Sequence, residues 1–234
     1  MSSNFNMPQS MPVIGLDADT RSTFITRTYM HLAGAILGFT LIEMFLFSSG
    51  IAYELARFML GGPWLLVLGA FMLVAWIGSS VAHRAESPAA QYAALAGYVV
   101  AEAIIFVPLL VIAEVTAPGV IQSAASVTIM GFIGLSAIVF YTRKDFSFMN
   151  SVLMWAGIVA LILIVASVLF GFELGTWFSV AMIGLAGGAI LRDTSNVLMH
   201  YPEDRYVAAA LSLFASVALL FWYVLRLFLQ LNRR

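Results

Sequence analysis

The residues best suited to chemistry in this sequence lie at the end of a long apolar run, around Asp193. Asn196 and His200 follow it at helical positions i+3 and i+7, so the three side chains share one helix face. A charged side chain in a membrane helix costs about 2.5–3.5 kcal/mol at the bilayer centre and often marks an ion or proton path. A carboxylate and an imidazole can also exchange protons near neutral pH. The pattern therefore predicts a polar stripe (Asp193, Asn196 and His200) that senses or carries protons.

The same residues also allow a simpler interpretation of the polar stripe. Arg192 would neutralise Asp193 at the membrane interface, and His200 would belong to the following loop. Ser212 and Ser216 lie one turn apart in the next apolar run and could face the stripe. Both interpretations place Asp193 close to the inner membrane surface.

Three further acids, Glu43, Glu102 and Glu114, lie in or against apolar runs. Glu102 is the deepest, and desolvation there would favour its neutral form. It is either a hydrogen-bonded core residue or part of a proton or cation path. Glu114 stands close to Pro118 and is expected at the outer membrane surface.

Several classes of function are excluded or disfavoured by what the sequence lacks. It contains no cysteine, no H-E-x-x-H, no G-x-S-x-G and no P-loop, so we expect no enzyme and no cofactor. Its single lysine, Lys144, lies in a loop and cannot form an intramembrane Schiff base with retinal. There is no basic run for nucleic acid. Calcium prefers six to eight oxygen ligands, so scattered acids predict weak calcium binding at most.

Composition and periodicity predict how these residues are positioned. The chain is 62% hydrophobic and 10% charged, with a mean hydropathy of +0.98, whereas soluble domains are roughly 25% charged. We predict an all-α polytopic membrane protein, because lipid tolerates only helices or closed barrels. A polar arm at 1–26 precedes a seven-helix transmembrane domain at 27–234. The seven predicted spans are 29–48, 64–82, 92–113, 120–141, 149–171, 175–198 and 206–229.

Lysine and arginine residues set the predicted orientation. With the N-terminus inside, the inner side carries seven of the 11 basic residues. We therefore predict a cytoplasmic N-terminus and an outer C-terminus. A re-entrant last segment, which would place Arg233 and Arg234 inside, is the alternative.

Small residues indicate where helices approach closely. Gly34 and Gly38 are four residues apart, as are Gly184 and Gly188. This spacing allows close backbone contact between membrane helices. The alternative is that glycine is simply common in such helices.

The loop between the fourth and fifth spans carries a recognisable motif. Tyr141-Thr142-Arg143-Lys144-Asp145-Phe146-Ser147-Phe148-Met149 resembles the loop signature of the Bax inhibitor-1 (transmembrane BAX inhibitor motif) family. Arg143, Lys144 and Asp145 are its candidate characteristic residues. Asp193-Thr194-Ser195-Asn196 and Glu203-Asp204-Arg205-Tyr206 follow in the order of that family, and Arg27-Thr28-Tyr29 precedes the first span. The resemblance covers the chain after residue 25 and is strongest to the bacterial YccA branch.

The resemblance implies seven helices arranged around a central one. In the calcium-leak members of the family, two aspartates on the last two helices share a proton and hold the pore shut. Asp193 matches the first aspartate, but the second position is Ser216. A lone carboxylate cannot reproduce the coupling of two close ones, and the serine resembles the protease-modulator branch.

The resemblance thus implies a non-enzymatic protein of the bacterial inner membrane that modulates an FtsH-type protease. Its partners would be the lipid bilayer and that protease. The alternative is a pH-sensitive leak for calcium, protons or another cation that uses Asp193, Glu102 and His200.

Overall fold

The computed structural model describes residues 11–62, 64–84 and 87–232, which are almost entirely helical. Over these residues there are eight α-helices and no strand, so the predicted all-α class is confirmed. Two short 3-10 turns, Val13–Gly15 and Glu203–Arg205, precede the first and last helices. The helices are α1 (Ala18–Ser48), α2 (Ile51–Gly61), α3 (Trp64–Arg84), α4 (Pro88–Thr116), α5 (Val120–Thr142), α6 (Met149–Phe170), α7 (Thr176–Met199) and α8 (Tyr206–Asn232).

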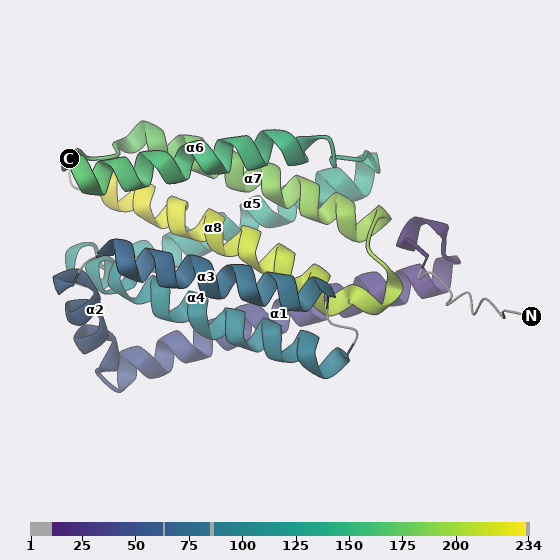
Figure 1. Cartoon of the computed structure of the whole chain (residues 1–234), viewed down its shortest axis with the longest axis horizontal. Coiled ribbons are helices and arrows are strands. Elements are labelled where there is room, and N and C mark those ends of the chain that lie inside the picture. Colours follow the sequence, from purple (N-terminus) through teal and green to yellow (C-terminus); the bar gives the residue numbers. More distant parts are fainter. Residues whose placement is uncertain (1–10, 63, 85–86, 233–234) are drawn as a thin grey trace, which may run out of the picture.

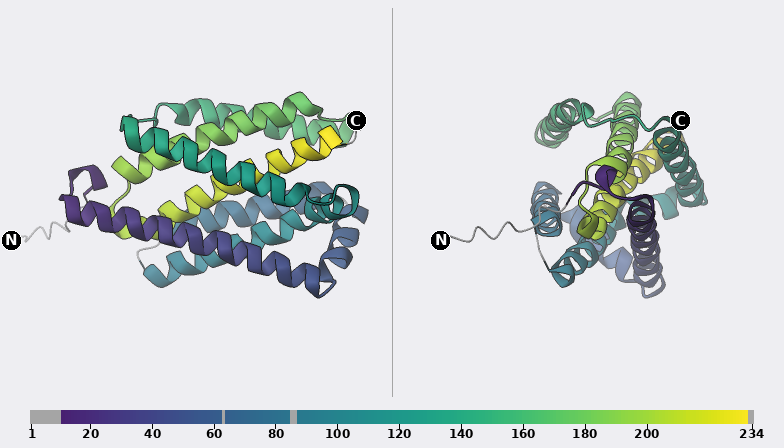
Figure 2. Two further views of the ribbon diagram at one scale, coloured as in Figure 1. Left: turned by 180° about the vertical axis from the view of Figure 1, so that it is seen from behind. Right: turned by 90° about the vertical axis from the view of Figure 1, so that its right-hand side faces the viewer.

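Helix α8 lies at the centre of the bundle. It contacts α1, α3, α4, α5 and α7 and runs between α1–α4 on one side and α5–α7 on the other (Figures 1 and 2). In its most apolar stretch of 18 residues, 72% of the residues are buried, compared with 11% in the corresponding stretch of α6. Ala208, Ala209 and Ala210 are fully buried on it, and small residues let neighbouring backbones approach closely. This is the central-helix arrangement that the resemblance implied.

Not every helix qualifies as a membrane span by length and composition. Among the described residues, five helical segments are long and apolar enough to cross a bilayer: α1, α4, α5, α6 and α8 with the turn before it. Helices α2 and α3 form a pair bent by 114° that counts as one broken span or as a re-entrant loop. Helix α7, which carries Arg192 and Asp193, is not among the five. Seven spans therefore stays a prediction.

The N-terminal segment contacts the loop between α7 and α8. The Val13 amide donates to the Tyr201 carbonyl over 2.9 Å, Pro12 pairs with Pro202, and Val13 is fully buried. Asp17 then caps α1, since its carboxylate accepts from the amides of Asp19 and Thr20. Helix α1 thus begins inside the predicted polar arm, of which residues 1–10 lie outside the described residues.

The small-residue prediction holds at one glycine in particular. A Cβ at Gly188 would lie 2.9 Å from Met149 Cε and 3.1 Å from Leu153 Cδ2, so α6 packs closely there. A Cβ at Gly38 would make only ordinary contact with Val99, at 3.7 Å. Gly34 and Gly184 have open space around the same position. Among these four glycines, Gly188 is therefore the one that allows two helices, α6 and α7, to pack closely.

Candidate functional site

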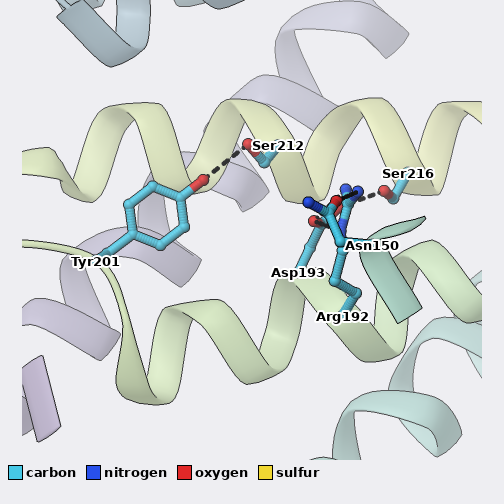
Figure 3. A network of polar contacts seen from close by, with 6 residues as sticks. All are labelled: Asn150, Arg192, Asp193, Tyr201, Ser212 and Ser216. Carbon is cyan, nitrogen blue, oxygen red and sulfur yellow. Dashed lines mark hydrogen bonds and ion pairs between the residues drawn. The ribbon is translucent and has the colours of Figure 1, made fainter. Parts of the chain in front are cut away.

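Asp193 is bound on both carboxylate oxygens (Figure 3). Oδ1 accepts hydrogen bonds from Arg192 Nε at 2.8 Å and from Nη2 at 2.5 Å. Oδ2 accepts a bond from Ser216 Oγ of α8 at 2.5 Å. Asp193 is only 2% exposed, and charge-assisted hydrogen bonds are what a buried carboxylate requires. The structure thus brings together the predicted Asp193 and Ser216, and it places Arg192 against Asp193.

This cluster joins three helices. Arg192 Nη1 also donates to Asn150 Oδ1 of α6 over 3.2 Å, so one guanidinium connects α6 with the carboxylate of α7. Ser216 then extends the connection to α8. The sequence did not identify Asn150, because an amide at a helix start has no distinctive spacing. The cluster (Asn150, Arg192, Asp193 and Ser216) fastens the end of α7 to its neighbours.

His200 and Asn196 have other contacts. His200 Nε2 lies 2.9 Å from Asp145 Oδ2, in the loop between α5 and α6. The backbone carbonyl of Asn196 accepts from the amides of His200 and Tyr201 and closes the end of α7. The hydrogen bond of His200 therefore goes to the loop between α5 and α6, a contact that neither interpretation of the polar stripe predicted.

Asp145 organises that loop. Its Oδ1 accepts from the Ser147 amide at 2.8 Å, and its Oδ2 faces His200. Ser195 accepts from the Phe146 amide over 3.0 Å and holds the loop against α7. The hydrogen bond from the Ser147 amide, then that from its hydroxyl and then His200, lower the pKa of Asp145 below its usual value.

The other two loop residues, Arg143 and Lys144, are exposed. Arg143 has a left-handed backbone (φ 50°) and caps α5, with its amide donating to Val139 over 2.8 Å. We therefore see a structural role for its backbone. Neither side chain joins the Asp193 cluster in the hydrogen bonds recorded for the described residues.

A second connection to α8 comes from Tyr201, which the sequence did not reveal. Its hydroxyl lies 2.9 Å from Ser212 Oγ, one turn of α8 before Ser216 (Figure 3). Burial raises the pKa of Tyr201 to about 12. Both serines of α8 thus bond to residues at the end of α7 or just after it.

Glu102 faces the same hollow as Asp193. A groove of about 610 Å³ follows α8 between α3 and α4 on one side and α6 and α7 on the other. Glu102 is 6% exposed and interacts with the Tyr98 hydroxyl one turn away. We call this hollow the α8 groove. Its lining includes Leu68, Phe71, Tyr98, Glu102, Gly157, Ala160, Met182, Asp193, Ser216 and Trp222.

Glu43 and Glu114 lie elsewhere. They line a separate cavity of about 500 Å³ between α1, α4, α5 and α8. Glu114 is exposed, in agreement with its predicted surface position. Glu43 is buried, and neither of its carboxyl oxygens has a hydrogen-bond partner among the described residues.

A metal site of ordinary type is not formed by these acids. Within the described ranges, no three His, Asp or Glu side chains gather closely enough to hold an ion. Asp193 and Glu102 line the same groove, but each is engaged by neighbouring side chains. The arrangement is suited to fastening helices together.

Fold and site together define a polytopic all-α membrane protein whose central helix is bound to its neighbour through a buried aspartate. The sequence matches the family model described as inhibitor of apoptosis-promoting Bax1 over residues 21–233. The chain therefore belongs to the Bax inhibitor family, as the loop and Asp193 motifs predicted.

Curated relatives are bacterial. The chain is 38% identical over 99 residues to the modulator of FtsH protease YccA of Escherichia coli, covering 42% of this chain and 45% of the relative. It is 35% identical over 112 residues (47% and 49%) to an uncharacterized protein of Pseudomonas aeruginosa. It is 36% identical over 108 residues (44% and 47%) to an uncharacterized membrane protein of Vibrio cholerae. The matched stretches span about half the length of these relatives.

Proposed function

We propose that this protein is a non-enzymatic modulator of an FtsH-type protease in a bacterial inner membrane. The similarity to a relative named modulator of FtsH protease carries the proposal. A second Escherichia coli relative, 38% identical over 99 residues, bears the name inner membrane protein YccA. Ser216 supports the same branch, because it bonds to Asp193 at the position where the leak-type members would have a second aspartate.

The partner would associate laterally, through membrane helices. The α8 groove supports this, because its lining is mostly apolar and comes from five helices. Small residues such as Gly157 and Ala160 line its α6 side, and small residues favour close helix packing in lipid. A membrane helix of the protease would pack along this groove.

Lateral association can be tested with a substitution that fills the α8 groove. A Cβ at Gly157 meets open space, so Gly157→Phe should fold and occupy the α8 groove. Gly34→Phe is the matched control, since Gly34 also has open space and does not line the groove. We expect Gly157→Phe to reduce co-purification of the protease and Gly34→Phe to leave it unchanged. Equal co-purification of both variants would contradict the groove as the contact.

The polar N-terminal arm would be the part that the protease engages, on the cytoplasmic side. The test replaces residues 2–10 with a Gly/Ser segment and keeps residues 11–17, because Val13 and Asp17 hold the start of α1. We expect changed turnover of the protein, or of a protease substrate, with an unchanged melting temperature. Unaltered turnover together with unaltered co-purification would argue against the proposal.

A second candidate function is a pH-sensitive cation leak. The observation that favours it is the position of two buried acids, Asp193 and Glu102, on one groove. Proteoliposomes with wild type and Asp193→Asn, compared between pH 6 and 8, test it by calcium and proton flux. Flux that depends on both pH and Asp193 supports the leak, and equal flux from the two proteins contradicts Asp193 as its gate.

A further inference from the structure

The cavity that contains Glu43 has the features of a binding site. We call it the Glu43 cavity: about 500 Å³, lined by α1, α4, α5 and α8. Phe106 and Ala218 line both this cavity and the α8 groove, so the two hollows share a wall formed by α4 and α8. The volume falls within the range of roughly 300–1,000 Å³ that is typical of small-molecule pockets.

The carboxyl group of Glu43 is the unusual feature of this cavity. Glu43 is 8% exposed, and both of its oxygens are buried without a hydrogen-bond partner among the described residues. Buried polar groups are nearly always satisfied, so an exception requires an explanation. A ligand that donates a hydrogen bond inside the cavity would supply the missing partner.

The polar groups gather toward one end of the cavity. Glu43 lies close to the end of α1, Glu114 close to the end of α4, and Gln122 close to the start of α5. The deeper lining is aliphatic and aromatic, with Ile36, Phe39 and Phe214. A fitting ligand therefore has one polar head and an apolar body.

The charged residues that line the cavity indicate the chemistry of the ligand's polar head. The described residues that line the cavity include two acids and no basic side chain. A cationic nitrogen can donate to Glu43, and once Glu43 ionises beside it the hydrogen bond is charge-assisted and roughly twice as strong as a neutral one. A phosphate beside the nitrogen, as in a phospholipid head, would have no basic side chain to pair with among these lining residues.

We propose that the Glu43 cavity binds a lipophilic amine, with the nitrogen on the Glu43 carboxyl and the apolar chain between α1, α5 and α8. The proposal is independent of the protease partner, because it concerns a different face of the central helix. It assigns the buried carboxyl of Glu43 to ligand recognition.

The experiment uses the full chain in nanodiscs made of phosphatidylcholine. The probe is dodecylamine with a photoreactive diazirine at its far end, and crosslinks are mapped by peptide mass spectrometry. Competitors are dodecylamine, dodecanol and dodecylphosphoethanolamine. We expect crosslinks on the facing surfaces of α1, α5 and α8, and competition by the amine at a roughly tenfold lower concentration than by the alcohol.

Three variants make the result specific. Glu43→Gln should abolish the preference for the amine over the alcohol, whereas Glu114→Gln, at the exposed end, should retain most of it. Ala125→Phe, which fills the cavity from α5, should remove the crosslinks with Glu43 intact. Equal competition by amine and alcohol, competition by dodecylphosphoethanolamine as strong as by the amine, or crosslinks that are unchanged in Ala125→Phe would overturn the proposal.

Discussion

Two buried carboxyl groups on opposite sides of α8 have contrasting surroundings. Asp193 accepts two hydrogen bonds from Arg192 and one from Ser216. Glu43 has no such bond among the described residues and lines a cavity of about 500 Å³. Both are more than nine-tenths buried, so burial alone does not explain what either does. The first belongs to the framework that joins α7 and α8, and the second is available to a ligand.

In this bundle, one buried carboxyl contributes to stability and the other is available for binding. A buried charge is tolerated when neighbouring groups compensate it, and removing a partner is costly. An uncompensated polar group is usually kept at functional sites, at some expense of stability. Changing the partners of each carboxyl in turn tests this separation.

The largest effect should follow from depriving Asp193 of its cation. Arg192→Met should lower the free energy of unfolding by about 3–5 kcal/mol, because it leaves a buried charge unpaired. Arg143→Met is the matched control, since Arg143 is exposed in a loop, and it should change stability by less than about 0.5 kcal/mol. Denaturant unfolding in detergent measures both. Equal destabilisation by the two variants would mean that the Arg192–Asp193 pair is not a structural contact.

Removing the other carboxyl should have the opposite sign. Glu43→Met eliminates a buried group that has no hydrogen-bond partner in the described part of the chain, and we expect a gain in stability of about 1–3 kcal/mol. The same unfolding measurement checks it, with Glu114→Met as a control at the exposed end of the cavity. A loss of stability comparable to that in Arg192→Met would show that Glu43 is compensated as Asp193 is.

A smaller effect is expected from the serine of α8. Ser216→Ala removes one hydrogen bond to Asp193 and should cost about 1–2 kcal/mol. Ser126→Ala is the control, because the hydrogen bond of the Ser126 hydroxyl, over the described ranges, goes to the Gln122 carbonyl of its own helix. If Arg192→Met and Ser216→Ala act on one cluster, the double variant will destabilise by less than the sum of the two.

The smallest effect concerns the loop between α5 and α6. Hydrogen bonds lower the folded-state pKa of Asp145, so its contribution is present at neutral pH and lost as the pH falls below about 4. The protection of the Phe146 amide, which donates to Ser195, should therefore fall in acid once its exchange rate is corrected for the intrinsic pH dependence of amide exchange. Asp145→Asn should exchange faster at neutral pH and respond less to acid, and Lys144→Gln should behave like wild type. If the acid response is unchanged in Asp145→Asn, the response belongs to another titrating group.

Much of this architecture could be predicted from the sequence. Apolar runs and Gly/Pro breaks placed most helices within a few residues, and the loop at Tyr141–Met149 together with Asp193 indicated the family. The helical spacing of Ser212 and Ser216 suggested that they could face the polar stripe; Ser216 bonds to Asp193 of that stripe, whereas Ser212 bonds to Tyr201, beyond it. These features are periodic or contiguous, so a single sequence records them.

The hydrogen bonds of the site and the Glu43 cavity could not be predicted, because they depend on contacts between segments that are distant in the sequence. The sequence placed His200 on the face of Asp193, but its hydrogen bond goes to Asp145, 55 residues away. Asn150, Tyr201 and Val13 were not singled out, because their partners lie on other helices or loops. The sequence likewise identified Glu43 as an acid at the end of an apolar run, and only the packing of four helices defines its cavity.

Asp193 is engaged by its neighbours, whereas Glu43 has no hydrogen-bond partner in the part of the chain that the structure describes. The most direct measurement is modification of both residues in one sample with the apolar reagent dicyclohexylcarbodiimide, followed over time by peptide mass spectrometry. The account predicts that Glu43 is modified while Asp193 is spared, and that Arg192→Met exposes Asp193 to the reagent. Modification of Asp193 as fast as that of Glu43 in the wild-type protein would contradict it.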